Sequence, residues 1–542
     1  MEEDILYGKH RHFFGGIAPS NTRWLITVND GVDTTGANIL VFGYAPLDTI
    51  IDGQMICCVG GIVIRKSYSD YPKDEFDGEL VADITRDEFD GAGNYFAISY
   101  KEPPSFSGRV YYRAFPYSKQ GVYNRNTTNM GMDYVDIKGD GSNVTRTYLF
   151  GYDLDTNNPD PVARVTYPSD VDNYHVNPAY MDYELDEFIP GGWERIIAEQ
   201  LYFTPRPCML KYDGTVDYYL DPDDYTRKEY GGTSDVANKS YDGNAMMEWP
   251  KIYTKRWEEN GIYHFRCSDV KIDEDYECWC NYDANNNEID HFYTAIYRGT
   301  TPTSYSTTRS LSGMGVTRGL SMTAERTRAK NNGAGWDLEV LADHLLIQDL
   351  LVLMAKSTDT QTAYGVGRAS NSFISTGSAN TSGLFSGANN SSKSVKVFGM
   401  EDWWGDLSRR ILGLTVYSGK LYAKITKGTK DGTSVTDYVI DSVSGYLQRG
   451  VTITSASYGY IKTLSTYPWG RLPGTFSGSA STYECDHGQI DYNTHSYMPA
   501  EIGGSYAVEN PYKGAFGCRF SYTAASQCDW MTSRLSYKPS AK

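Results

Sequence analysis

Short runs of β-branched and aromatic residues, separated by polar residues and glycine, are the dominant pattern in the first quarter of the chain. The clearest runs lie at residues 24–28, 39–44 and 56–59. Runs of this length between Asp, Gly and Pro residues predict short strands, and several such strands at regular spacing are typical of a β-sandwich. We therefore expect residues 21–130 to form a β-sandwich domain.

Hairpin signals dominate residues 131–300. The dipeptides at 213–214 (Asp-Gly) and 260–261 (Asn-Gly) each lie between two runs of strand-forming residues. Both dipeptides readily adopt the positive φ angles that a two-residue hairpin turn requires. The middle of the chain is therefore expected to be a domain rich in β-hairpins.

Helix signals first become strong in residues 301–542. Residues 338–356 carry acidic side chains near their start and a lysine at their end, which suits the dipole of a helix. From Leu345 onward this segment is apolar almost all round, so we expect a buried helix. A polar surface loop at 369–394, a strand and a second short helix around 402–411 follow. This order predicts an α+β domain at the end of a mainly β, multi-domain protein.

Composition narrows the range of functions. The 542 residues include 50 Lys and Arg against 68 Asp and Glu, for a formal net charge of −18. Since nucleic-acid binding depends on clustered positive charge, we expect no nucleic-acid partner. Tyrosine is unusually frequent, with 46 residues against 19 Phe and 10 Trp. Many tyrosines suit β-rich domains with amphipathic contact surfaces.

The sequence also bears on location. No segment has the roughly 20 apolar residues that a membrane helix needs, so we expect no membrane insertion. The chain starts with Met-Glu-Glu-Asp, unlike a basic and apolar secretory signal, and its nine cysteines are an odd number. Both features favour synthesis in a cytoplasm with reduced thiols. His10 and His12 lie in a basic and aromatic patch, and we interpret residues 1–20 as an N-terminal docking segment.

Residues 108–124 resemble the last hairpin of a fibronectin type III module. In such modules a Tyr-rich strand leads through a glycine turn to the closing strand, and here Val110, Tyr112 and Ala114 share one face before a turn that ends at Gly121. Fibronectin type III modules are common spacers in tail proteins of bacterial viruses. The resemblance implies that the predicted sandwich is of this type.

The C-terminal part, from about residue 317, resembles the C-type-lectin fold. Residues 397–405 are similar to the segment that opens the second helix in the branch shared with formylglycine-generating enzymes. The end of the chain is similar to phage receptor-binding proteins of this fold, including the variable proteins of diversity-generating retroelements. The segments that carry this second similarity are 503–506, 514–516 and 533–537.

In that family the last segment displays ligand-contacting side chains between fixed positions that pack inward. The resemblance places the fixed positions at Gly514, Phe516, Ala525, Ser526, Arg534 and Leu535. The candidate ligand-binding residues are Tyr506, Cys518, Arg519, Ser521, Tyr522, Thr523, Gln527, Asp529, Trp530 and Thr532. Independently of this resemblance, a mixture of Arg, aromatic and small polar side chains provides contact area and adaptable hydrogen bonds for binding.

The resemblance implies a virion protein of a tailed bacteriophage, in a tail fibre, tail tip or head fibre. Its expected partners are a bacterial surface receptor, glycan or protein, and other virion proteins, and proteins of this kind often form homotrimers. Two alternatives stay open. One is a decoration protein of head or tail without receptor binding, and the other is a surface-glycan depolymerase.

Metal-binding patterns in the sequence are incomplete. Cys485, His487 and His495 are the most compact group of zinc-type ligands, but the usual paired-cysteine spacing is missing, so we interpret them as polar loop residues. Turns beginning at Asp153 and Asp283 start like calcium loops but lack the required Gly and Glu, and Asx-turns explain them. We expect no bound metal and no cofactor.

No catalytic pattern is complete either. Formylglycine-generating enzymes use two closely spaced cysteines, whereas the nearest pair here, Cys518 and Cys528, is ten residues apart. Cys278 and Cys280 alternate along a predicted strand, which favours buried thiols on one side over a disulfide. Because any glycosidase needs only two carboxylates at a suitable distance, 68 acidic residues nominate no particular pair. We therefore expect a binding protein and not an enzyme.

Overall fold

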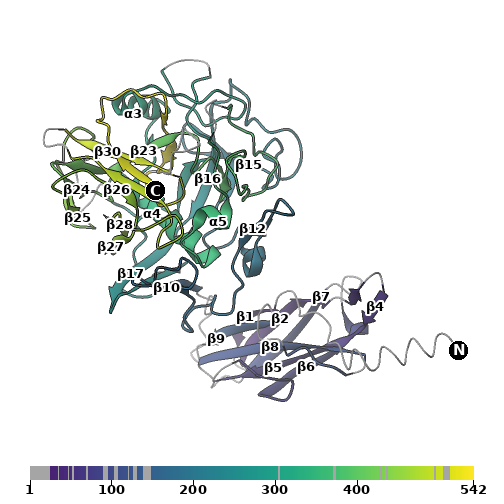
Figure 1. The fold of residues 1–542 in the computed structure, drawn as a ribbon. Coiled ribbons are helices and arrows are strands. Elements are labelled where there is room, and N and C mark those ends of the chain that lie inside the picture. Colours follow the sequence, from purple (N-terminus) through teal and green to yellow (C-terminus); the bar gives the residue numbers. More distant parts are fainter. Residues whose placement is uncertain are drawn as a thin grey trace. The chain divides into compact units, whose positions relative to one another are not determined.

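The computed structural model is mainly β, as the sequence predicts, and its strands form several separate sheets (Figure 1). The chain divides into two compact units, Met1–Thr147 with His175–Asn177, and Tyr148–Tyr174 with Pro178–Lys542. The structure describes residues 25–33, 36–46, 48–51, 54–68, 71–89, 95–102, 108–119, 121–125, 131–137, 148–302, 306–369, 374–426, 430–434, 437–492, 496–504 and 513–541. The predicted docking segment at 1–20 therefore lies outside the described residues.

The first unit contains two sheets that share one hydrophobic core. The three-stranded sheet has the order β1 (Leu25–Asp33), β2 (Gly36–Tyr44), β7 (Tyr95–Glu102). The four-stranded sheet has the order β6 (Glu79–Thr85), β5 (Val59–Ser67), β8 (Gly108–Ser118), β9 (Met132–Ile137). Ile39 and Phe96 from the first sheet belong to the same buried cluster as Ile62 and Tyr112 from the second. The predicted sandwich is therefore present, together with the small hairpin of β3 (Thr49–Ile51) and β4 (Gln54–Cys57) and the short helix η1 (Arg86–Glu88).

The end of this sandwich differs from the prediction. Val110, Tyr112 and Ala114 of β8 do face the core, at 0–2% exposure. However, among the described residues Gly121 is followed by an isolated bridge between Tyr117 and Tyr123, and the next strand in the chain that pairs with β8 is β9. The first unit therefore extends beyond the predicted boundary at residue 130.

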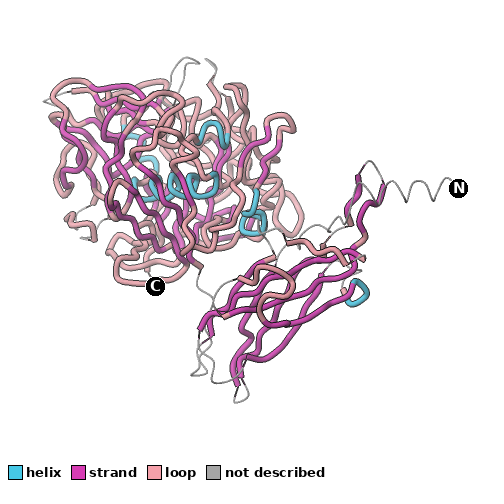
Figure 2. Tube along the Cα trace, turned by 60° about the horizontal axis from the view of Figure 1, so that its bottom comes forward, coloured by secondary structure: helices cyan, strands magenta, loops and turns pink. Residues whose placement is uncertain are grey.

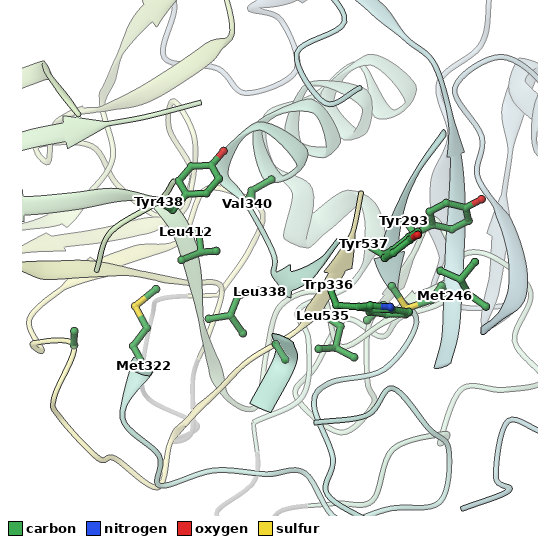
Figure 3. Close-up of a cluster of buried hydrophobic side chains, with 14 of the residues drawn as sticks. Met246, Tyr293, Met322, Trp336, Leu338, Val340, Leu412, Tyr438, Leu535 and Tyr537 are labelled. Atoms are coloured by element: carbon green, nitrogen blue, oxygen red, sulfur yellow. The ribbon is translucent and has the colours of Figure 1, made fainter. Parts of the chain in front are cut away.

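The second unit contains a six-stranded sheet built from distant parts of the chain. Its order is β15 (Val216–Tyr219), β14 (Arg206–Lys211), β16 (Gly243–Pro250), β19 (His291–Ala295), β33 (Leu535–Tyr537), β20 (Trp336–Leu338). The last strand of the chain thus lies between strands from either side of residue 300. The buried cluster beside it also combines Met246 and Tyr293 with Leu412 and Leu535 (Figure 3). The predicted boundary at residue 300 therefore does not separate two compact units, because both parts share one sheet and one core.

A larger sheet carries the C-terminal segment. Its order is β25 (Leu447–Thr452), β24 (Lys420–Ala423), β23 (Ser408–Tyr417), β30 (Met498–Ile502), β31 (Cys518–Phe520), β29 (His487–Ile490), β26 (Ser457–Tyr460), with β32 (Met531–Thr532) paired to β23. A four-stranded sheet has the order β11 (Val165–Thr166), β10 (Leu149–Asp155), β18 (Ile262–Ser268), β17 (Tyr253–Glu259). Three hairpins complete the strands: β12 (Tyr180–Asp182) with β13 (Glu187–Ile189), β21 (Lys396–Val397) with β22 (Met400–Glu401), and β27 (Thr463–Tyr467) with β28 (Gly470–Thr475).

The helices of the second unit are few and lie among strands and loops (Figure 2). They are η2 (Gly191–Trp193), α2 (Glu194–Ala198), α3 (Met322–Lys330), α4 (Leu341–Ala355) and α5 (Thr360–Tyr364). Every residue of α4 is buried, as its apolar sequence predicts. It begins later than expected because residues 336–338 join the six-stranded sheet as β20. Among the described residues, no helix combines the length and apolar character needed to cross a membrane.

The structure confirms the two predicted hairpin turns but not the second predicted helix. Asn260 and Gly261 have φ angles of 53° and 77° and connect β17 to β18, and the Asp-Gly turn connects β14 to β15, so both hairpins are confirmed. The helix expected at 402–411 is wrong. Asp402 and Asp406 both have φ of 53°, which interrupts a helix, and the following residues form β23 within the large sheet.

Candidate functional site

Strand β31 presents the centre of the predicted binding segment. It pairs parallel with β29 and antiparallel with β30. Side chains alternate across a strand, and Cys518 and Phe520 face the interior at 3% and 0% exposure, while Arg519 between them is half-buried on the other face. Arg519 is therefore the one residue of this strand that the sheet directs toward the outer face.

Arg519 belongs to a row of polar side chains that crosses the large sheet. In register along this row lie Tyr458 of β26, Gln489 of β29, Arg519 of β31, Glu501 of β30 and Arg410 of β23. Residues directly opposite one another on neighbouring strands project from the same face. The row starts at Tyr458, which is 72% exposed, and ends at Arg410, which is 1% exposed. It therefore connects the surface to the interior.

The buried end of the row is held by paired charges. An ion pair of 3.1 Å joins Arg410 to Glu325 of α3, and both side chains are about 2% exposed. The same guanidinium donates to the carbonyl oxygens of Leu320 at 2.9 Å and of Ser526 at 2.6 Å. Arg410 thus fixes the loop at 521–530 to the sheet below it and to the start of α3.

Glu501 is the one acid of the row and is buried, at 2% exposure. Burial raises its pKa to about 8, although the positive charges of Arg519 and Arg410 on either side act in the opposite direction. The carboxyl group is thus kept largely in its neutral form at neutral pH. Burial also raises the pKa of Glu325 to about 7, against the effect of Arg410.

Replacing Glu501 by Gln is expected to stabilise the second unit at about pH 9 by about 4–5 kcal/mol, with little change near pH 5. A folded pKa above the unfolded value means that stability is full below the unfolded pKa of 4.5 and falls as the pH rises toward 8. The Gln variant has no proton to lose and avoids this fall. Urea unfolding followed by tryptophan fluorescence measures it, since all tryptophans except Trp24 belong to the second unit. Glu199→Gln, at an exposed and paired side chain, is the control. An equal effect at both pH values would contradict the prediction.

Above the row, the loop brings three large side chains together. The guanidinium carbon of Arg519 lies 4.8 Å from the ring centroid of Tyr522, and Nε of Arg519 donates to Ser521 Oγ at 3.1 Å. The ring of Tyr522 meets that of Trp530 edge to face at 5.7 Å. The backbone N–H of Thr523 donates to Ser526 Oγ at 3.1 Å, which closes the turn between them. The loop therefore has internal order and holds an Arg–Tyr–Trp cluster in place.

The structure places most of the predicted ligand-binding residues at or near the surface. Gln527 and Asp529 are exposed, and the half-buried residues are Arg519, Ser521, Tyr522, Thr523 and Trp530. Asp529 faces Arg318 at 4.0 Å with most of its side chain in solvent. Tyr506 lies outside the described residues. We call the surface formed by Arg519, Ser521, Tyr522, Gln527, Asp529 and Trp530 the loop face.

Two predicted ligand contacts are corrected by the structure. Cys518 is buried because it alternates with Arg519 and points to the other side of β31. Thr532 is fully buried, and its hydroxyl donates to the carbonyl oxygen of Thr317 at 2.8 Å. Among the expected fixed positions, Gly514, Phe516, Arg534 and Leu535 are buried, but Ala525 is exposed on the turn and Ser526 is only half-buried.

The neighbours of the loop face were not predicted from the sequence. Tyr458 and Gln489 continue the row beyond Arg519, and Glu501 supports it from below. They lie on strands that are distant in sequence, so no local pattern connects them. The one signal was Glu501 itself, a single acid in the otherwise apolar segment Met-Pro-Ala-Glu-Ile.

The candidate metal ligands are otherwise engaged. The Oδ1 atom of Asp283 accepts the backbone N–H groups of Asn285 and Asn287, both at 2.8 Å, which is the expected Asx-turn. Asp153 pairs with Arg266 and His264 at 2.8 Å. Cys485 is buried with a raised pKa, and His495 lies outside the described residues.

The cysteines, like the other candidate metal ligands, have contacts or a protonation state that disfavour binding a metal ion. Each cysteine whose side chain the structure describes is a free thiol, including the buried Cys278 and Cys280, as predicted. Glu277, Cys278 and Glu288 come close enough to hold an ion. However, Lys430 and Lys251 neutralise the two carboxylates at 3.3 and 3.6 Å, and burial raises the pKa of the Cys278 thiol to about 12. A cation would have to compete with two lysines and a protonated thiol.

No protein-family model matches this chain, and no curated protein sequence is similar to it.

Proposed function

We propose that this protein is a virion component of a tailed bacteriophage that binds the bacterial surface through the loop face. The observation that carries the proposal is the support beneath that face. A buried ionic pair, Arg410 with Glu325, anchors a loop that holds Arg519, Tyr522 and Trp530 against one another. Arg, Tyr and Trp are the residues that most often dominate binding energy at interfaces. A rigid base also reduces the entropy lost on binding.

The fold supports the two resemblances on which the proposal draws. In the first unit, a three-stranded sheet of β1, β2 and β7 faces a four-stranded sheet of β6, β5, β8 and β9, which is the arrangement expected of a fibronectin type III module. In the second unit, β20 precedes the buried helix α4 and pairs with the closing strand β33. Such pairing of an early and a final strand suits a C-type-lectin-like domain.

The proposal assigns a part to each region. The first unit serves as a spacer that connects to other virion proteins, and the second unit carries the loop face toward a glycan or protein receptor. Assembly as a homotrimer would present three such faces, and multivalency would convert weak single contacts into stable adsorption. The proposed role is binding and not catalysis.

Adsorption to bacteria tests this function. The double variant Arg519→Ala with Tyr522→Ala is expected to bind at least about tenfold more weakly than the original protein, because it removes the cation–π contact and one of the two aromatic rings of the loop face. The measurement is binding of fluorescently labelled protein to whole cells of a panel of Gram-negative and Gram-positive strains. Tyr230→Ala is the matched control, since Tyr230 is 92% exposed and lies on a different loop.

The possible outcomes separate the proposed function from its alternatives. Equal adsorption of the double variant would reject the loop face as the receptor site. A protein that binds no cells, but that antibodies locate on the head or tail of virions by electron microscopy, would be a decoration protein. Release of sugars from the cell surface would instead indicate a depolymerase.

A further inference from the structure

A cavity of about 870 Å³ lies in the second unit, away from the loop face. One wall comes from the β12–β13 hairpin and α2, including Phe188 and Glu194, and the other comes from the loop at 378–394. The volume lies within the range of about 300–1,000 Å³ that is usual for small-molecule sites. The cavity shares no residue with the loop face, so it is a separate candidate site.

The loop that forms one wall is held in place by buried charges. Both oxygens of the Glu401 carboxylate accept backbone N–H groups, from Gly377 and Ala379, each at 2.8 Å. The buried Lys396 Nζ donates to the carbonyl oxygen of Ala379 at 2.9 Å and lies 3.7 Å from the ring centroid of Tyr225. The sequence predicted a plain surface loop here, but Phe385 within it is only 5% exposed. An irregular segment fixed in this way is preorganised for a ligand.

The floor of the cavity is aromatic. The ring of Phe188, which is half-buried, stacks on Phe385 at 4.5 Å with an angle of 15° between the planes. Tyr364 continues the stack behind them, 5.8 Å from Phe385. Since Phe188 is backed by two further rings, its orientation is fixed, and the cavity keeps one apolar surface.

The remaining lining is polar. Hydroxyl groups of Thr381, Ser382, Ser386 and Ser392 line the cavity, together with four acidic and two basic side chains. The acidic side chains are Asp186, Glu187, Glu194 and Asp223, and the basic ones are Arg368 and Lys393. Lys393 already pairs with Asp186 across the two walls. The lining is therefore net negative and disfavours an anionic ligand.

We infer that this cavity binds a neutral saccharide. The apolar C–H face of a sugar ring can pack against a fixed aromatic surface. The sugar hydroxyl groups can donate hydrogen bonds to carboxylates and can both donate hydrogen bonds to and accept them from Ser or Thr hydroxyls. A purely apolar ligand would leave the carboxylates desolvated and unpaired. A phosphate, sulfate or uronic acid would meet the excess negative charge. The inference does not depend on the function proposed for the loop face.

An array of neutral oligosaccharides, with sulfated and uronic acid-containing oligosaccharides as a second arm, tests this inference with the full chain. We expect binding to members of the neutral arm, and titration calorimetry with the strongest of them gives the affinity. Phe188→Ala and Asp223→Ala are each expected to weaken that affinity at least about tenfold. Leu185→Ala on the same hairpin and Asp224→Ala beside Asp223 are matched controls, because neither residue lines the cavity.

Binding only to the anionic arm, absence of binding to either arm, or affinities of the Phe188→Ala and Asp223→Ala variants equal to that of the original protein would each overturn the inference. The Arg519→Ala variant separates this site from the loop face. It is expected to leave saccharide binding unchanged, so the cavity and the proposed receptor site can fail independently.

Discussion

Replacing Asp349 by Asn is expected to destabilise the second unit by about 3–5 kcal/mol. Asp349 lies within α4 and is buried. Its Oδ1 accepts from the hydroxyls of Tyr152 at 2.7 Å and Tyr263 at 3.1 Å, and its Oδ2 accepts from Arg256 Nε at 2.7 Å. The Asn variant removes the only negative charge in direct contact with the buried Arg256 in the described structure, and its amide group offers a donor where an acceptor is needed.

Urea unfolding followed by tryptophan fluorescence measures this loss. Asp290→Asn is the matched control, because its side chain is 87% exposed and its pair with Lys251 contributes little. Tyr263→Phe provides a milder test that keeps the charge, with an expected loss of about 1 kcal/mol. If Asp349→Asn and Asp290→Asn had equal effects, Asp349 would not be the link between α4 and the strands β10, β17 and β18.

Local patterns predicted the elements that local forces determine. The Asn-Gly turn formed the expected two-residue hairpin with positive φ at both residues, whereas in the Asp-Gly hairpin only Gly214 has positive φ. Helix α4 is buried, as expected of a segment that is apolar almost all round. The segment at 402–411 shows the limit. Its two tryptophans and flanking charges resemble an amphipathic helix, but Trp403 and Trp404 are both fully buried in a turn before β23. The positive φ angles of Asp402 and Asp406 interrupt the helical pattern on either side of them.

Domain boundaries could not be predicted because the decisive contacts are distant in sequence. Tyr293 pairs with Tyr537, and Trp336 pairs with the same residue from the other side. No local sequence feature of β19, β20 or β33 predicts that these three short segments pair with one another. Their aromatic rings form part of one core (Figure 3).

Contacts between residues distant in sequence also limited the prediction of the loop face. The sequence and the resemblance identified Arg519, Tyr522 and Trp530, because their residue types are typical of binding surfaces. Resemblance alone placed Cys518 among the displayed residues, whereas alternation along β31 turns its side chain inward. The support for the row of polar side chains depends on the pairing of β23 with β30, which places Arg410 opposite Glu501, about 90 positions later in the chain.

Replacing Arg534 by Met is expected to cost about 3 kcal/mol of stability in the second unit. Arg534 is fully buried one residue before β33, and its guanidinium donates to the carbonyl oxygens of Ala295 at 2.8 Å, Ile296 at 3.0 Å and Glu401. Methionine fills a similar volume but leaves these three acceptors without the donor. The start of the closing strand then loses the side-chain hydrogen bonds that connect it to the end of β19 and to β22.

Urea unfolding of Arg534→Met against Arg318→Met measures this effect, since Arg318 is 36% exposed and its nearest acid is 4.0 Å away. Hydrogen exchange adds a local readout. Because the N–H of Glu339 donates to the carbonyl oxygen of Arg534 at 3.0 Å, we expect faster exchange at Glu339 and through β33 in the Arg534 variant than in the control. Unchanged exchange there, with unchanged stability, would mean that strand pairing alone holds β33 in the six-stranded sheet.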